Sequence, residues 1–278
     1  NGCVINFTVY ATDTSNNVKQ NSTLVTVTPE LEITNCTNLN TPNTNYSLIN
    51  DANSGGTCFY VLANNVTLDC HGYEINYSQS VTGYGVNVTS YNYSTIRSCN
   101  IVQADLATDN ADSYGVYVFK NSSNNVVFNN TITTLANSVG VWLQSTVYNN
   151  NIYTNTIIGS GTSGIGVYLL TTVYNNSIYS NNITVTGGGD GVELTTTVYN
   201  NSIYSNIITV TGGGEGIELT STTYDNNIYS NNITSSGATA VGVYVGSTNS
   251  YNNKIYNCFR LIIHKFRYIF IYEIHNFE

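Results

Sequence analysis

The chain has 278 residues, of which only 8% are charged, and 16 acidic against 7 basic side chains give a net charge of −9. This length allows one large domain or two small ones. The acidic balance argues against nucleic acid as a partner, because phosphate binding needs clustered Lys and Arg. With three scattered His, no Met and no Cys-x-x-Cys pattern, we expect neither a structural metal site nor a cofactor.

The chain begins at Asn1 and shows no secretory leader, so we expect a mature or excised segment. Fourteen Asn-x-Ser/Thr sequons, six cysteines and few lysines favour an extracellular, glycosylated protein. We therefore expect this protein outside the cell or at the cell surface.

Residues 1–30 differ from the rest of the chain. Two alternating segments, residues 4–10 and 22–27, flank a turn-like Asp-Thr-Ser-Asn-Asn run at residues 13–17. This pattern predicts a β-hairpin. It resembles the last two strands of immunoglobulin-like or cadherin-like surface modules, and the alternative is an N-terminal hairpin of the main domain.

Residues 31–258 are dominated by a repeat of about 25 residues. Residues 174–198 and 199–223 are near copies of each other. The first tyrosine of the repeat recurs every 25 to 27 residues, at Tyr148, Tyr174, Tyr199, Tyr224 and Tyr251. A fixed period in this range indicates a stacked repeat architecture.

Each repeat contains a Gly-aliphatic-x-aliphatic strand, as at residues 191–194, with a second strand near residues 177–180 and a third near 182–186. Alternation turns the aliphatic side chains inward and the x residue outward. Three short strands and three turns form one rung of a parallel β-helix, and the segment has room for about eight or nine rungs.

The run at residues 64–75, Asn-Asn-Val-Thr-Leu-Asp-x-x-Gly-Tyr-x-Ile, opens a series of Gly-Val-x-Val repeats. It resembles the start of a right-handed parallel β-helix of the pectin-lyase-like superfamily, and is similar to NosD-like periplasmic copper-binding and surface repeat proteins. The resemblance covers about residues 33–258 and implies an all-β solenoid. The scarcity of His and the lack of Met do not support copper binding.

Stacking should bring equivalent residues of neighbouring rungs into contact, since rungs lie ~4.8 Å apart. Asparagines in one phase predict an amide ladder, with members Asn130, Asn155, Asn181, Asn206 and Asn231. Tyrosines in two phases predict two outward columns. These columns either stack to stabilise the solenoid or bind sugar rings, and the candidate carbohydrate-binding residues are Tyr174, Tyr179, Tyr199 and Tyr204.

The cysteine spacing suggests two disulfides. Cys70 and Cys99 lie about one rung apart, and a Cys36–Cys58 bond would tie down the N-terminal cap. Cys258 falls in the asparagine-ladder phase. Nearby, we expect Asp69 and His71 to cap the first rungs rather than form a catalytic dyad.

The most suggestive polar set consists of four acidic residues in the two near-copies, Asp190, Glu193, Glu215 and Glu218. Stacking places Asp190 beside Glu215 and Glu193 beside Glu218, roughly 5 Å apart. Such carboxylates could be an acid/base pair, a Ca²⁺ site, or a solvated column copied with the repeat. Family lyases add an Arg or Lys base, which this face lacks.

Residues 259–278 change composition abruptly and gain basic and apolar side chains. The tail is too charged for a membrane span, and we expect no membrane insertion. It could be a capping strand, an assembly interface or an out-of-frame artefact.

Two functions remain open. The first is a non-catalytic structural or adhesive protein of the cell surface, presenting Asn, Thr and Tyr faces to glycans, other copies of itself or surface proteins. The second is a polysaccharide lyase or glycoside hydrolase. A groove with convergent acidic or basic residues would favour the enzyme.

Overall fold

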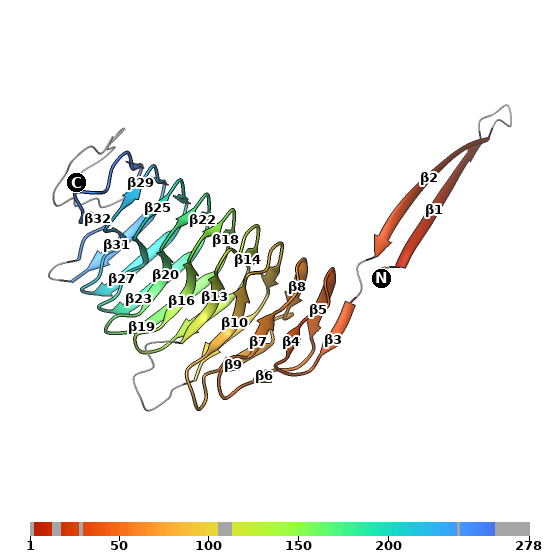
Figure 1. Ribbon diagram of the computed structural model, residues 1–278, viewed down its shortest axis with the longest axis horizontal. Coiled ribbons are helices and arrows are strands. Elements are labelled where there is room, and N and C mark those ends of the chain that lie inside the picture. The colour runs from red at the N-terminus through yellow and green to blue at the C-terminus, as the bar shows by residue number, and fades with distance from the viewer. Residues whose placement is uncertain (1–2, 13–17, 28–29, 105–112, 238–239, 259–278) are drawn as a thin grey trace.

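A computed structural model describes residues 3–12, 18–27, 30–104, 113–237 and 240–258. The expected tail at 259–278 lies outside the described residues. The described part is all β-strand, turn and irregular structure, with no helix that could cross a membrane. It forms a right-handed parallel β-helix, which confirms the predicted fold (Figure 1).

The predicted N-terminal hairpin is present as a separate two-stranded sheet. Strands β1 (Cys3–Thr12) and β2 (Val18–Val27) pair antiparallel, from Cys3 opposite Val27 to Thr12 opposite Val18. Figure 1 shows this hairpin projecting beyond the first rung of the stack.

Three long parallel sheets run the length of the stack, with nine, ten and eight strands, which agrees with the eight or nine rungs expected. The nine-stranded sheet contains β4 (Asn38–Leu39), β7 (Phe59–Val61), β10 (Tyr84–Thr89), β13 (Tyr114–Phe119), β16 (Val139–Gln144), β20 (Ile165–Leu170), β24 (Val192–Thr195), β28 (Ile217–Leu219) and β32 (Val243–Val245).

The ten-stranded sheet contains β3 (Glu30–Ile33), β5 (Thr44–Leu48), β8 (Val66–Asp69), β11 (Thr95–Arg97), β14 (Val126–Phe128), β18 (Asn151–Tyr153), β22 (Ser177–Tyr179), β26 (Ser202–Tyr204), β30 (Asn227–Tyr229) and β33 (Lys254–Tyr256). The eight-stranded sheet contains β6 (Ala52–Asn53), β9 (Glu74–Tyr77), β12 (Asn100–Gln103), β15 (Thr131–Thr134), β19 (Thr156–Gly161), β23 (Asn182–Gly187), β27 (Ile207–Gly212) and β31 (Asn232–Ser236).

The middle rungs contain a fourth short strand, where three strands per rung were expected. This four-stranded sheet consists of β17 (Val147–Tyr148), β21 (Val173–Tyr174), β25 (Val198–Tyr199) and β29 (Thr223–Tyr224). The difference arises because the Val-Tyr pair of each repeat is in register with its neighbours for two residues, enough to form a ladder between two turns.

The core is a dry column of stacked aliphatic side chains. Val167, Val192 and Ile217 pair across successive strands of the nine-stranded sheet, and each is fully buried. The turn before this sheet needs glycine, because Gly187 and Gly212 have positive φ and a Cβ there would collide with the carbonyl oxygen of the preceding rung.

Two buried asparagine ladders line the turns. The predicted ladder is confirmed: the Nδ2 of Asn155, for example, donates to the Oδ1 of Asn181 at 3.0 Å. Cys258 occupies its last described position, 4.0 Å from the Nδ2 of Asn231. A second ladder, which the sequence analysis missed, lies two residues after the first tyrosine of each repeat, or after Ser123, which takes that place in the first of these rungs. It contains Asn125, Asn150, Asn176, Asn201, Asn226 and Asn253.

Both predicted disulfides are present and close the N-terminal rungs. Cys36 bonds Cys58, and Cys70 bonds Cys99, with Cα–Cα distances of 4.6 and 4.7 Å. These short distances follow from stacking, because each pair joins adjacent rungs.

Candidate functional site

Of the four predicted acidic residues, Glu193 and Glu218 lie on strands β24 and β28 of the nine-stranded sheet, and Asp190 and Glu215 lie in the turns that precede these strands. We refer to the four as the carboxylate block. Glu193 on β24 pairs directly with Glu218 on β28. The aliphatic residues on either side of each glutamate are buried, so both glutamate side chains point away from the core. The register confirms the predicted stacking of this pair.

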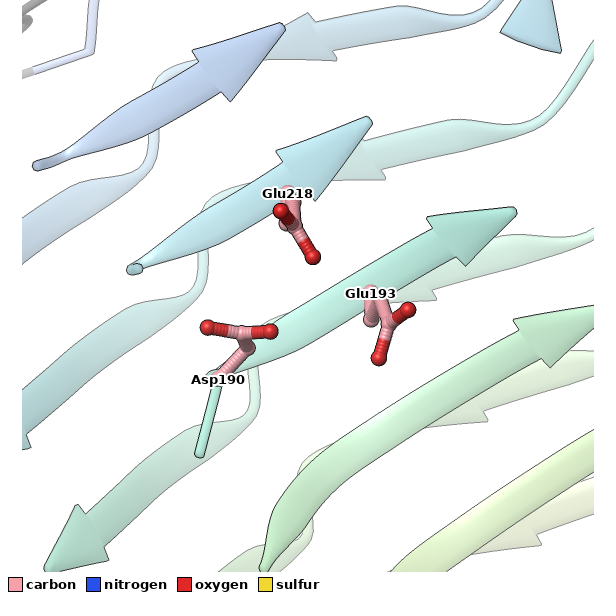
Figure 2. Close-up of side chains that lie close together, drawn as sticks. All are labelled: Asp190, Glu193 and Glu218. Atoms are coloured by element: carbon pink, nitrogen blue, oxygen red, sulfur yellow. The ribbon is translucent and has the colours of Figure 1, made fainter. Parts of the chain in front are cut away.

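Asp190 joins this pair from the turn before β24. Its Oδ1 accepts a hydrogen bond of 2.6 Å from the backbone N–H of Glu215. One oxygen each of Asp190, Glu193 and Glu218 lies within 4.8 Å of the others, and Figure 2 shows the three side chains gathered over two adjacent strands. Asp190 is only 8% exposed, so it is not part of a fully solvated column.

Burial and mutual repulsion make these carboxyls weak acids. Burial, followed by the charges of Asp190 and Glu215, raises the pKa of Glu193 to about 7. The pKa of Glu218 rises to about 7 through burial and the charges of Asp190 and Glu193. Burial and the proximity of Asp190 raise the pKa of Glu215 to about 7, and burial also raises the pKa of Asp190. Near neutral pH the block therefore holds both protonated and ionised carboxyls.

This arrangement can do two kinds of chemistry. A protonated and an ionised carboxyl side by side can serve as general acid and as nucleophile or base. Ionised carboxylates can also hold a Ca²⁺ ion, which takes six to eight oxygen ligands. Asp190, Glu193 and Glu218 would supply part of that set, and water or ligand oxygens would supply the rest.

A contiguous group of aromatic rings lies on the same sheet face; we call it the aromatic patch. Its rings contact one another at centroid distances from 4.3 to 5.7 Å. The members are Tyr84, Tyr114, Tyr117, Phe119, Trp142 and Tyr168. The sequence analysis missed this patch, although several of these residues occupy the outward x position of the Gly-aliphatic-x-aliphatic strands.

The aromatic patch and the carboxylate block form one continuous column. Trp142 pairs with Tyr168, Tyr168 with Glu193, Glu193 with Glu218, and Glu218 with Tyr244. Burial and the charges of Glu193, Glu218 and Asp190 raise the pKa of Tyr168 to about 12. The Tyr168 phenol therefore stays protonated beside the carboxylates and can donate a hydrogen bond.

The tyrosines predicted to bind carbohydrate lie on other sheets. Tyr174 and Tyr199 stack on the four-stranded sheet, with ring centroids 5.0 Å apart. Tyr179 and Tyr204 stack on the ten-stranded sheet, also at 5.0 Å. Interplanar angles of 6° and 3° mean that each ring covers its neighbour's face, which is the arrangement expected of a stabilising column.

A separate group of polar residues lies next to the Cys70–Cys99 disulfide. The Nε2 of His71 lies 2.8 Å from the Oγ of Ser47, and its Nδ1 lies 3.6 Å from Asp69. Asp69 also pairs with Arg97 at 2.8 Å and accepts a hydrogen bond from the His71 backbone. An open depression of about 500 Å³ adjoins His71, but Ser47 is 5% exposed and does not line it. We interpret this group as a turn cap, as predicted.

Comparisons with known proteins identify the fold. No family model and no curated protein sequence matches this chain. Among solved structures, the enzymatically active domain of the bacteriophage CBA120 tailspike protein 2 aligns with a TM-score of 0.51 and 14% identity, over 82% of this chain and 38% of that one. DFA-IIIase from Arthrobacter chlorophenolicus A6, solved with DFA-III, aligns with a TM-score of 0.53 and 10% identity, over 84% of this chain and 72% of that one.

At these identities the likeness establishes the fold alone. This chain has the parallel β-helix fold and spans 38% of the tailspike chain. The similarity to NosD-like repeat proteins stays a prediction.

Proposed function

We propose that this protein is a polysaccharide-active β-helix that hydrolyses glycosidic bonds at the carboxylate block. The observation that carries the proposal is the pairing of Glu193 with Glu218 across adjacent strands, with the pKa of each near 7. Both structural neighbours described above carry names of enzymes or enzymatically active domains, which is consistent with the proposal. Of the two functions left open by the sequence, this proposal takes the second, the carbohydrate-active enzyme.

The spacing of the two carboxyls fits a retaining hydrolase. Retaining enzymes place their carboxyl groups about 5–5.5 Å apart, whereas inverting enzymes separate them by about 6.5–9.5 Å. Here adjacent parallel strands hold Glu193 and Glu218 one rung apart, ~4.8 Å, with oxygens within 4.8 Å.

The reaction then needs only this pair and water. The protonated carboxyl donates its proton to the glycosidic oxygen, and the ionised one attacks the anomeric carbon to form a glycosyl ester. The first residue, now ionised, takes a proton from water, which attacks the ester and releases the sugar. Asp190 is held in place by the Glu215 N–H, and in its ionised form it would place a negative charge close to the positive charge that develops on the sugar.

Hydrolysis is favoured over elimination by the charges at the site. Lyases of this kind use an Arg or Lys near the abstracted proton, but none of the basic side chains among the described residues contributes to the pKa shifts of the four carboxyls. In the described part of the stack, Arg97 is paired with Asp69 on the ten-stranded sheet.

The test is a reducing-sugar assay over a panel of extracellular polysaccharides. Against a polymer that the native protein cleaves, Glu193→Gln and Glu218→Gln should each lower the rate by about 10²–10⁴-fold. Glu30→Gln, at an exposed position of β3, is the matched control and should retain full activity. Product analysis by NMR should show retention at the anomeric carbon. A double Glu193→Gln/Glu218→Gln variant with native activity would exclude the site.

A non-catalytic surface role remains a second proposal, because the tyrosine columns and asparagine ladders continue through successive rungs. Such a rod could present its faces to glycans or to copies of itself. The two disulfides support the extracellular location that both proposals require. Glycan-array binding without turnover would favour this role, and the absence of both would remove its adhesive form.

A further inference from the structure

We propose that the aromatic patch is the sugar-binding track of this protein, that the bound glycan runs parallel to the β-helix axis, and that its sugars carry no carboxylate, sulfate or phosphate group. The inference deepens the hydrolysis proposed above and rests on it for the position of the scissile bond. It replaces the sequence-based assignment of sugar binding to Tyr174, Tyr179, Tyr199 and Tyr204.

The first argument is the accessibility of the rings. Tyr114 and Tyr117 are only 5% and 9% exposed, so they form the buried base of the patch. Trp142 packs edge-on against Tyr114 with centroids 4.3 Å apart, and Tyr168 follows it at 5.1 Å. Trp142 and Tyr168 are half-buried, which leaves part of each ring available to the apolar C–H groups of a sugar.

The second argument is the difference between the end of this column and the columns on other sheets. Each middle tyrosine of the other columns, such as Tyr179, has a parallel ring on both sides. Tyr168 has Trp142 on one side only, and the next outward residue in register is Glu193. The aromatic column therefore ends where the carboxylate block begins. The side of Tyr168 that no ring covers is turned toward Glu193, where the proposed reaction takes place.

The third argument is the spacing along the axis. Trp142, Tyr168, Glu193 and Glu218 occupy four consecutive rungs, each ~4.8 Å apart. One sugar residue of an extended glycan is about as long as one rung step. The sugar residues of a glycan that lies along the axis therefore match the rungs one to one. The Glu193–Glu218 pair then lies at one glycosidic bond, and the aromatic rings lie under the sugars on one side of that bond.

Charge defines the substrate class. The four members of the carboxylate block adjoin the end of the track, and burial, together with repulsion among them, raises the pKa of each glutamate. A uronic or sulfated sugar would add another negative charge at the same place. Neutral or amino sugars avoid this repulsion.

Binding to the Glu218→Gln variant separates the track from turnover. The probes are neutral oligosaccharides of the cello-, xylo- and N-acetylchito- series from disaccharide to hexasaccharide, with galacturonic acid oligomers of equal length as the anionic arm. Calorimetry should show affinity rising with length until the track is filled, and weak or no binding of the anionic oligomers.

Point variants locate the track. Trp142→Ala and Tyr168→Ala should each weaken binding about tenfold, since loss of one aromatic contact removes on the order of 1.4 kcal/mol. Trp142→Phe and Tyr168→Phe should restore most of it. Tyr179→Ala, which removes a partly buried ring from the ten-stranded sheet, is the control and should change binding less than twofold.

Each result has a distinct consequence. Binding lost in Tyr179→Ala but retained in Trp142→Ala and Tyr168→Ala would overturn the track, as would preference for the anionic oligomers. Track-dependent binding by a native protein that cleaves no polymer would leave the inference standing and remove the proposed hydrolysis. Cleavage whose KM is unchanged in Tyr168→Ala and Trp142→Ala would remove the inference and leave hydrolysis intact.

Discussion

The ten-stranded and nine-stranded sheets are built from the same repeat, yet their outer faces differ. On the ten-stranded sheet the outward position is tyrosine in every rung from Tyr153 to Tyr256. On the nine-stranded sheet the same column changes from Trp142 and Tyr168 to Glu193 and Glu218, and then to Tyr244. A solenoid gains stability when identical side chains stack. A break in such a column, above all one that brings like charges together, needs another reason, and the proposed glycan would supply it.

The largest expected effect belongs to the regular region. Asn201 is fully buried, its Nδ2 donates to Val173, Tyr199 and Asn226, and its Oδ1 accepts from Asn176. Asn201→Ala leaves several buried backbone groups unpaired, and we expect a loss of about 3–5 kcal/mol of unfolding free energy, at 1–3 kcal/mol per group.

Urea denaturation followed by circular dichroism measures this loss. Asn182→Ala, at an exposed position of β23, is the control and should change stability by less than about 0.5 kcal/mol. Equal unfolding midpoints for the two variants would show that the ladder does not hold the rungs together.

Periodicity made the regular region predictable from sequence. Identical residues at a fixed spacing must stack, so the first asparagine ladder and both tyrosine columns followed from the repeat alone. The second ladder was visible in principle as the second asparagine of each Tyr-Asn-Asn run, but its burial depends on a turn that the fourth strand creates. The fourth strand itself is only two residues long, too short for an alternation pattern to detect.

The candidate site was only half predictable. The stacking of Glu193 on Glu218 followed from the period, whereas the burial of Asp190 depends on how the glycine-rich turn folds over it. The aromatic patch was not predicted because its members are not identical. Tyr117, Trp142 and Tyr168 share one column, but a column of different aromatic residues leaves no exact repeat in the sequence.

The second-largest expected effect is a pH dependence of stability that arises from the carboxylate block of the nine-stranded sheet. Folded-state pKa values of about 7 for Glu193 and Glu218 exceed the ordinary value of 4.5. The native state therefore binds more protons at these two groups than the unfolded state does between these pH values. Their contribution to stability is fully present below pH 4.5 and is lost as the pH rises through 7. We expect the carboxylate block to contribute a loss on the order of 1–2 kcal/mol per buried carboxyl, after allowance for solvent screening.

Thermal unfolding between pH 4.5 and 8 measures this loss. The Glu193→Gln/Glu218→Gln variant should show a flatter dependence of Tm on pH and should exceed the native Tm at pH 8. Millimolar Ca²⁺ should raise the native Tm at pH 8 more than at pH 5 if the block also binds cations, because protonated carboxyls are poor ligands. A native Tm that rises steadily from pH 4.5 to 8 would contradict the raised pKa values.

The smallest effect concerns the tyrosine columns. Tyr199 stacks between Tyr174 and Tyr224 with centroids 5.0 and 4.9 Å away, so Tyr199→Ala removes two ring contacts. We expect about 1 kcal/mol of lost stability, in the range measured for aromatic pairs, and unchanged glycan affinity. Tyr168→Ala should instead weaken glycan binding and lower the stability less. Tyr168 contacts the ring of Trp142 and adjoins the carboxylate block. If Tyr199→Ala instead weakened glycan binding without lowering Tm, the regular columns would be recognition surfaces, and the contrast between the two sheets would lose its functional meaning.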